Sequence, residues 1–104
     1  MLAFSVGGNS AACPTTAESA TSFSNITSVV LFVNTSNTTQ TIYHGNSADT
    51  SEIIGSVLIL PNERLMLWKR IPGHKFWATS NEVIGTPGMA FSPTQVARSN
   101  QNVS

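Results

Sequence analysis

Short runs of β-branched and aromatic residues, each ended by a cluster of turn-forming residues, constrain the fold of this chain most. Residues 29–33 (VVLFV) are the clearest run, and the turn formers at 34–37 (NTSN) follow directly. Valine, isoleucine and aromatic residues favour strands, whereas glycine, proline, asparagine and serine favour turns. Because this alternation continues through the centre of the sequence, it predicts a domain of short strands.

Further runs of this kind cover residues 39–43, 53–60, 64–70 and 75–79, and two very short ones, 83–84 and 89–91, flank residues 85–88. Within 64–70 leucines alternate with Met66 and Trp68, so both sides of that strand should be partly covered. Residues 71–74 (IPGH) are a strong turn signal, which makes 75–79 the returning partner of a hairpin. Seven glycines and five prolines would be costly in helices. The sequence predicts an all-β protein, a single small β-sandwich that is immunoglobulin-like or jelly-roll-like.

The two ends of the chain differ from this centre. Residues 1–27 and 93–104 are small and polar, so we expect an extended N-terminal arm, a sandwich body over 28–92 and a C-terminal tail. Such an arm is disordered by itself, and ordering about 25 residues costs on the order of 25 to 50 kcal/mol. Backbone hydrogen bonds or adjoining subunits would have to hold it. The expected partner-binding anchors are Met1, Leu2, Phe4, Val6 and Phe23.

Charged residues make up only 10% of the chain, and five basic residues balance five acidic ones. A chain with no net charge is not drawn to nucleic acid or to an anionic membrane, and no apolar run is long enough to cross a bilayer. We therefore expect neither nucleic acid nor membrane as a partner. A neutral surface suits a protein packed among neighbours, because net charge is what usually keeps free monomers apart.

Reactive side chains are too few and too scattered to predict an enzyme. His44 with Asp49 and Glu52 could suggest a metal or acid–base site, but their spacing fits no ligand pattern. Cys13, the single cysteine, can form no disulfide within the chain and lies in the arm without a fixed base. The sequence contains no phosphate-binding loop, zinc-binding pattern or nucleophile motif. We expect no catalytic residue, no metal and no cofactor.

Basic residues concentrate around the expected hairpin turn. They are Lys69, Arg70, His74 and Lys75, with Trp68 and Trp77 on either side. This tip could contact an acidic patch on a partner subunit, or nucleic acid through phosphate pairing and stacking. It could equally be a solvated tip whose tryptophans belong to the core. DNA binding usually needs several more phosphate contacts, so partner binding and simple solvation are the two main readings.

Aromatic side chains offer a different binding mode, a platform for sugars. The candidates are Phe23, Phe32, Tyr43, Trp68, Phe76, Trp77 and Phe91. In so small a domain most of them must fill the core. A surplus left exposed would favour sugar binding, so a receptor-binding module is the alternative function.

Four short motifs carry a resemblance to a known class of proteins. In chain order they are VNTS (33–36), TIYHG (41–45), LILPNE (58–63) and FWATS (76–80). Over residues 29–91 this order resembles the head decoration or cement proteins of tailed bacteriophages and related appendage domains. Leu60 directly precedes Pro61 without the usual spacer, and Asn62 stands where glycine is common. Asparagine tolerates the positive φ that such a turn requires.

The resemblance implies a structural, non-catalytic virion protein, a capsid decoration protein that stabilises the particle. Its implied partners are the major capsid protein or other virion subunits, together with copies of itself in a homo-oligomer, for which a trimer is one option. Its implied location is the virion, assembled in the host cytoplasm. The alternative is a tail or head-fibre appendage that binds a glycan receptor on the host.

Overall fold

The structure is a computed structural model that describes residues 3–24, 26–45, 53–69, 71 and 73–91. In these residues it contains eight strands and one short 3-10 helix, η1 (Ala17–Ser19). The strands are β1 (Ala3–Val6), β2 (Ala11–Ala12), β3 (Val29–Asn34), β4 (Gln40–Gly45), β5 (Ile53–Ile59), β6 (Arg64–Trp68), β7 (Lys75–Ala78) and β8 (Val83–Phe91). They form two antiparallel sheets, which confirms the predicted small all-β sandwich.

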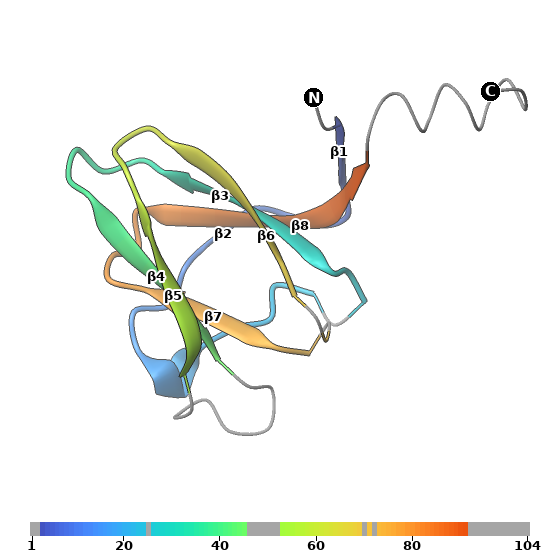
Figure 1. Ribbon diagram of the computed structural model, residues 1–104, viewed down its shortest axis with the longest axis horizontal. Helices are drawn as coiled ribbons and strands as arrows, with labels where there is room; N and C mark the ends of the chain where they lie inside the picture. The colour runs from blue at the N-terminus through green and yellow to red at the C-terminus, as the bar shows by residue number, and fades with distance from the viewer. Residues whose placement is uncertain (1–2, 25, 46–52, 70, 72, 92–104) are drawn as a thin grey trace, which may run out of the picture.

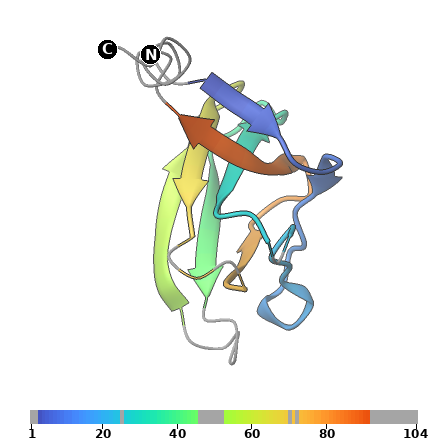
Figure 2. The ribbon, with the colours of Figure 1, turned by 90° about the vertical axis from the view of Figure 1, so that its right-hand side faces the viewer.

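The pairing of strands joins the first described strand to the last. Sheet A has the order β1-β8-β3-β6 with β2 also on β8, and sheet B has the order β5-β4-β7 (Figures 1 and 2). Between β2 and β3, Thr21 makes an isolated antiparallel bridge with Phe76 of β7. Pairing thus proceeds inward along the chain, from β1 with β8 to β4 with β5. This nested pattern in two sheets is that of a jelly roll rather than an immunoglobulin domain.

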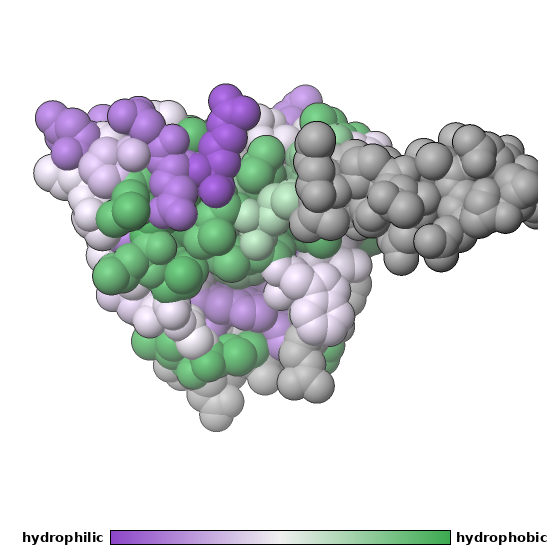
Figure 3. Space-filling model, turned by 45° about the horizontal axis from the view of Figure 1, so that its top comes forward, coloured by the Kyte–Doolittle hydropathy of each residue, from purple (hydrophilic) through white to green (hydrophobic). Residues whose placement is uncertain are grey.

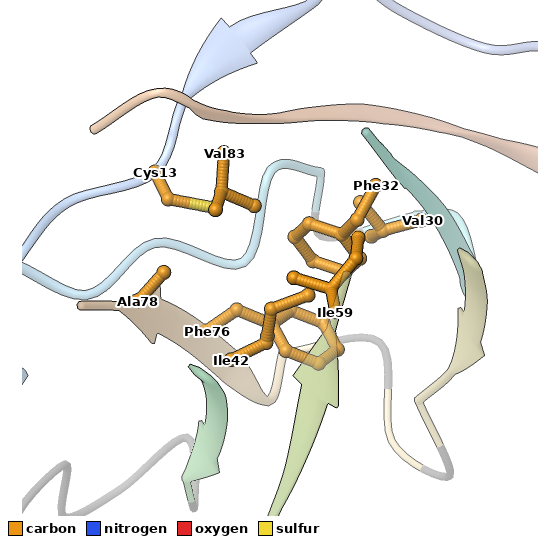
Figure 4. Packing of buried hydrophobic residues seen from close by; sticks show 8 residues of the cluster. All are labelled: Cys13, Val30, Phe32, Ile42, Ile59, Phe76, Ala78 and Val83. Carbon is orange, nitrogen blue, oxygen red and sulfur yellow. The ribbon is translucent and has the colours of Figure 1, made fainter. Parts of the chain in front are cut away.

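The core lies between the sheets, where alternate residues of each strand point inward. On β3, Val30 and Phe32 are buried, while Leu31 between them is only half-buried. The buried apolar cluster draws on both sheets and on the segment after β2 (Figure 4): Cys13, Val30, Phe32, Ile42, Ile59, Phe76, Ala78 and Val83. The rings of Phe32 and Phe76 meet edge to face with centroids 5.0 Å apart, which joins the two sheets.

Two asparagines hold the turns at one end of the sandwich. Asn34 is buried, and its Nδ2 donates to the carbonyl oxygens of Thr38 at 2.8 Å and Ile59 at 3.0 Å. Asn62 has a φ of 62°, which confirms the positive φ expected of this turn. Glu63 Oε1 accepts a hydrogen bond from Leu60 N at 2.8 Å. A short, well-bonded connection therefore leads from β5 in sheet B to β6 in sheet A.

Two predictions about strand connections are wrong. β6 and β7 do not form a hairpin, because β6 pairs with β3 in sheet A and β7 pairs with β4 in sheet B. The turn signal marks a crossing between the sheets. Residues 83–91 form one strand instead of two. Pro87 lies in this strand between the residues that pair with β1 and those that pair with β2, so no ladder hydrogen bond requires the N–H that proline lacks. The Pro87 carbonyl is still used and accepts from Gly7 N at 2.8 Å.

The N-terminal segment is extended, as expected, but its own chain holds it. β1 and β2 pair with β8, and Cys13 N donates to Val83 O at 2.8 Å while the Cys13 side chain lies in the core. The described part of residues 1–27 therefore belongs to the sandwich, because β8 supplies backbone partners up to Cys13 and β7 supplies them at Pro14 and Thr21. Met1, Leu2 and the predicted tail at 93–104 lie outside the described residues.

Candidate functional site

The outer side of sheet A, opposite sheet B, carries apolar side chains from four strands. Strand pairing places Trp68, Val29 and Gly88 in one row across β6, β3 and β8, with Met66 and Leu31 in the next. These positions alternate with residues that point into the core, so they point outward. We define the outer apolar face as Val6, Val29, Leu31, Val33, Met66, Trp68 and Ile84.

Solvent reaches this face. Trp68 is 64% exposed and Val6 is 68% exposed, while the other members of the face are half-buried within the sheet. Seen from above and in front, apolar residues gather in a broad band over this side of the molecule and its adjoining edge (Figure 3). A shallow hollow of about 200 Å³ lies on it, lined by Ser28, Val29, Trp68, Gly88 and Met89. Exposed apolar side chains grouped on one face are typical of interaction surfaces.

The predicted arm anchors divide between this face and the core. Val6 belongs to the outer apolar face, and Phe4 is half-buried against Gly88, where an added Cβ would lie 2.6 Å from the Phe4 ring. Phe23 has a φ of 62°, which is rare for a bulky residue, and its ring meets Phe32 edge to face at 5.6 Å. Phe23 thus packs against the core of its own chain, and its role as a partner anchor stays a prediction.

Lys69, expected on a hairpin tip, is instead fully buried. Its Nζ donates to the main-chain oxygens of Ser22 and Ser24, both at 2.7 Å. Burial lowers the pKa of Lys69 from 10.5 to about 8, because the ammonium form loses its hydration. The side chain holds the segment before β3 against the end of β6. The solvated tip is therefore wrong for this residue, and the partner contact stays a prediction.

His74 is buried as well and faces His44 on β4. His74 Nδ1 and His44 Nε2 lie 3.1 Å apart, so one ring donates a hydrogen bond to the other. The His44 ring also stacks on Phe76 with centroids 4.7 Å apart. Burial, and then the charges of His74 and Lys69, lower the pKa of His44 below 6.5. We call His44, Lys69 and His74 the basic cluster.

A cleft of about 180 Å³ reaches His44 from the edge of the sandwich where β5 and β6 lie. Its walls come from both sheets: Ile42, His44, Gly55, Ser56, Val57, Leu67, Trp68 and Phe76. The lining is mostly apolar, with His44 and Ser56 as polar groups. The cleft gives solvent a route to the half-buried His44, and Trp68 belongs both to this cleft and to the outer apolar face.

Of the remaining predicted residues, only Lys75 lies in the part of the chain that the structure describes. Lys75 is half-buried on β7 opposite Gly45, while Arg70, Asp49 and Glu52 lie outside the described residues. No group of three or more histidine, cysteine or acidic residues in the described ranges could hold a metal ion. The spacing of His44 and His74 did not predict their contact. Antiparallel pairing of the strand that contains His44 with the strand that follows His74 would have indicated it.

Comparisons with known proteins leave the site to be interpreted from its own geometry: no family model, no curated protein and no solved structure matches this chain. No helix within the described ranges is long and apolar enough to cross a membrane. The fold and the site define a small all-β sandwich domain with an outer apolar face and a basic cluster beside it.

Proposed function

We propose that this chain is a structural, non-enzymatic protein of a bacteriophage particle, and that it attaches to the particle as a capsid decoration protein. The observation that carries the proposal is the outer apolar face, which presents side chains of four strands to solvent. Its partner is the major capsid protein or another virion subunit, alongside further copies of the chain itself. The resemblance of residues 29–91 to phage decoration proteins supports this kind of particle.

The chemistry of the face favours attachment by burial of apolar surface. One charged residue, Arg64, lies opposite Val33 in the row at one end of the face. The rows that contain Leu31 and Val29 are uncharged. Burying such surface contributes about 25 cal/mol per Å², without the salt dependence of ionic contacts. Jelly-roll domains recur in viral capsids and in lectins, which supports a particle role while leaving the assignment to the site.

Adding the protein back to stripped particles tests the proposal. Particles that lack the protein should lose resistance to heat or low salt and regain it when the wild-type chain is added. Met66→Gln keeps the side-chain length but places an amide in the contact, so we expect about tenfold weaker binding.

A matched control lies on the other sheet. Leu58 of β5 is 64% exposed, and Leu58→Gln should bind particles as the wild type does. Equal binding by the Met66 and Leu58 variants, both weaker or both unchanged, would contradict attachment through the outer apolar face.

Glycan binding is the second candidate, and the exposure of Trp68 favours it. An exposed tryptophan beside a shallow hollow can stack on a sugar ring. Under this function Trp68→Ala should abolish adsorption to host cells while the heat resistance of the particle stays unchanged. Under the decoration function the same variant should weaken particle binding and leave adsorption alone.

A further inference from the structure

The contact between His44 and His74 lies where the chain crosses from sheet A to sheet B. The β4–β7 ladder ends at the pair Gly45 and Lys75, and His74 is the next residue of the crossing. The His74 N–H donates to Ile71 O at 2.9 Å, which closes the turn, and its ring turns back to His44. The contact between the two rings therefore links β4 to the residue just before β7, one position beyond the end of the ladder.

The hydrogen bond between the rings depends on their protonation. A neutral imidazole has one N–H donor and one acceptor nitrogen, whereas an imidazolium has two donors and no acceptor. Two neutral rings can share the bond, and so can one neutral and one charged ring. Two charged rings cannot, because two N–H groups would then face each other across 3.1 Å.

We propose that this hydrogen bond is a pH-sensitive fastening of the crossing, which holds while at least one ring is neutral and is lost when both rings are protonated.

The surrounding charges decide how far the two protonation steps separate. Lys69 from the end of β6 acts on His44 in addition to His74, and Lys75 of β7 lies opposite Gly45. β5 contributes the uncharged Gly55 and Ser56 to the cleft wall, and η1, which carries Glu18, lies beside β7. The described groups that act on His44 are thus cationic, and they resist the second proton. Interacting groups of this kind titrate as a pair with two apparent pKa values.

The basic cluster fits a proton-responsive role better than a metal site. Two imidazole nitrogens converge here, and the nearby Lys69 ammonium disfavours a second cation. The cleft between β5 and β6 gives solvent access to His44. Because Trp68 lines the same cleft and precedes Lys69, loss of the fastening should also change the surroundings of Trp68.

Imidazole titration by NMR on the full chain tests the proposal directly. The chain has only two histidines, so every imidazole signal belongs to this pair. We expect the pair to titrate in two separate steps. In His74→Gln, whose amide can donate and accept at every pH, His44 should titrate in a single step at a higher pH than the second step of the wild type. Identical, independent midpoints in wild type and variant would overturn the proposal, and His44→Gln gives the same comparison if His74→Gln does not fold.

Amide hydrogen exchange shows whether the crossing is released locally. Corrected for intrinsic rates, exchange at the His74 amide should accelerate about tenfold below the second titration step and should not do so in His74→Gln. The Cys13 amide, bonded to Val83 O on sheet A, is the internal control and should not change. Equal acceleration at both amides would mean global unfolding and would overturn the proposal. Loss of the two-step titration when Zn²⁺ is added at neutral pH would also overturn the proposal, because the pair would then be a metal site.

Discussion

The outer sides of the two sheets differ, although one small sandwich contains both. Sheet A turns valine, leucine, methionine and tryptophan outward. On sheet B the edge strand β5 also exposes Leu58, but β4 and the end of β7 turn Thr41, Tyr43 and Thr79 outward. Here Thr79 Oγ1 donates to Gln40 Oε1 at 2.6 Å and accepts from Thr41 N at 2.9 Å. Trp77 stacks on Tyr43 at 5.4 Å and is buried, whereas Trp68 on sheet A is exposed, so only one tryptophan is covered.

This difference separates the outer surface of β4 and β7, where hydroxyl groups are bonded within the chain, from an apolar face that gains stability when a partner covers it. Hydroxyl groups bonded to their own sheet gain little from a new contact, whereas exposed apolar side chains gain from any surface that covers them. The course of β6 supports the distinction. Trp68 points outward, and the next residue, Lys69, carries its ammonium group inward to two carbonyl oxygens. The chain thus keeps a charge away from the outer apolar face.

Neighbouring residues of β3 provide the largest expected effect. Phe32 is fully buried between the sheets, so Phe32→Ala should destabilise the protein by about 3–5 kcal/mol. Leu31 faces outward on the same strand, and Leu31→Ala should cost only about 1 kcal/mol. Urea unfolding of both variants measures the difference. Equal costs would mean that the outer side of sheet A is already covered in the free chain.

Lys69 should make stability depend on pH in the alkaline range. Its pKa is about 8 in the folded chain against 10.5 ordinarily, so the unfolded chain binds more protons between these values and stability rises with pH across this window. At about 1.4 kcal/mol per pKa unit, a gain of roughly 2–3 kcal/mol is expected. Urea unfolding at pH 8 and pH 10.5 measures it. Lys69→Met should remove the rise, and a rise that persists in this variant would assign it to another group.

The outer apolar face should bind a hydrophobic dye in the native state. Leu31→Gln should remove most of this binding and change stability by less than about 1 kcal/mol, since it lies outside the core. Leu58→Gln on sheet B is the matched control and should retain the dye signal. Fluorescence titration of the folded proteins decides the outcome, and a loss in the Leu58 variant alone would place the binding surface on the other sheet.

The turn between the two sheets provides the smallest effect. Asn62 already has a φ of 62°, where glycine is unstrained, so Asn62→Gly should change stability by no more than about 0.5 kcal/mol. Thermal unfolding measures this shift. Asn62→Val places a β-branched residue at positive φ and should cost more than about 1 kcal/mol of stability. An equal cost for the glycine and valine variants would show that this φ does not control the turn.

The strands could be predicted from the sequence because each rests on local signals. The β-branched run at β3 and the left-handed turn at Asn62 both follow from residue preferences over a few positions. The assignment of strands to sheets could not be predicted, because a turn signal such as residues 71–74 serves equally for a hairpin and for a crossing between sheets. By sequence, Pro87 indicated a break between two strands. It nevertheless lies within β8, because neither β1 nor β2 pairs with that position.

The candidate site was harder to predict than the fold. The outer apolar face follows from alternation along β3 and β6, but only the structure shows which side faces away from sheet B. Lys69 is an ordinary surface residue by its chemistry, and its burial depends on carbonyl oxygens 45 and 47 positions earlier. His44 and His74 are 30 residues apart. Such contacts depend on long-range pairing, which no local pattern encodes.

The pairing of β1 with β8 also constrains how the molecule forms. Ala3 lies opposite Phe91, so sheet A cannot be completed during synthesis until nearly ninety residues have followed its first strand out of the ribosome. Contacts of such high sequence separation require closure of long loops before they contribute stability, and domains dominated by them fold in milliseconds to seconds rather than microseconds. Until β1 has paired with β8, the edge of β8 is open and can accept a strand from another copy of the chain.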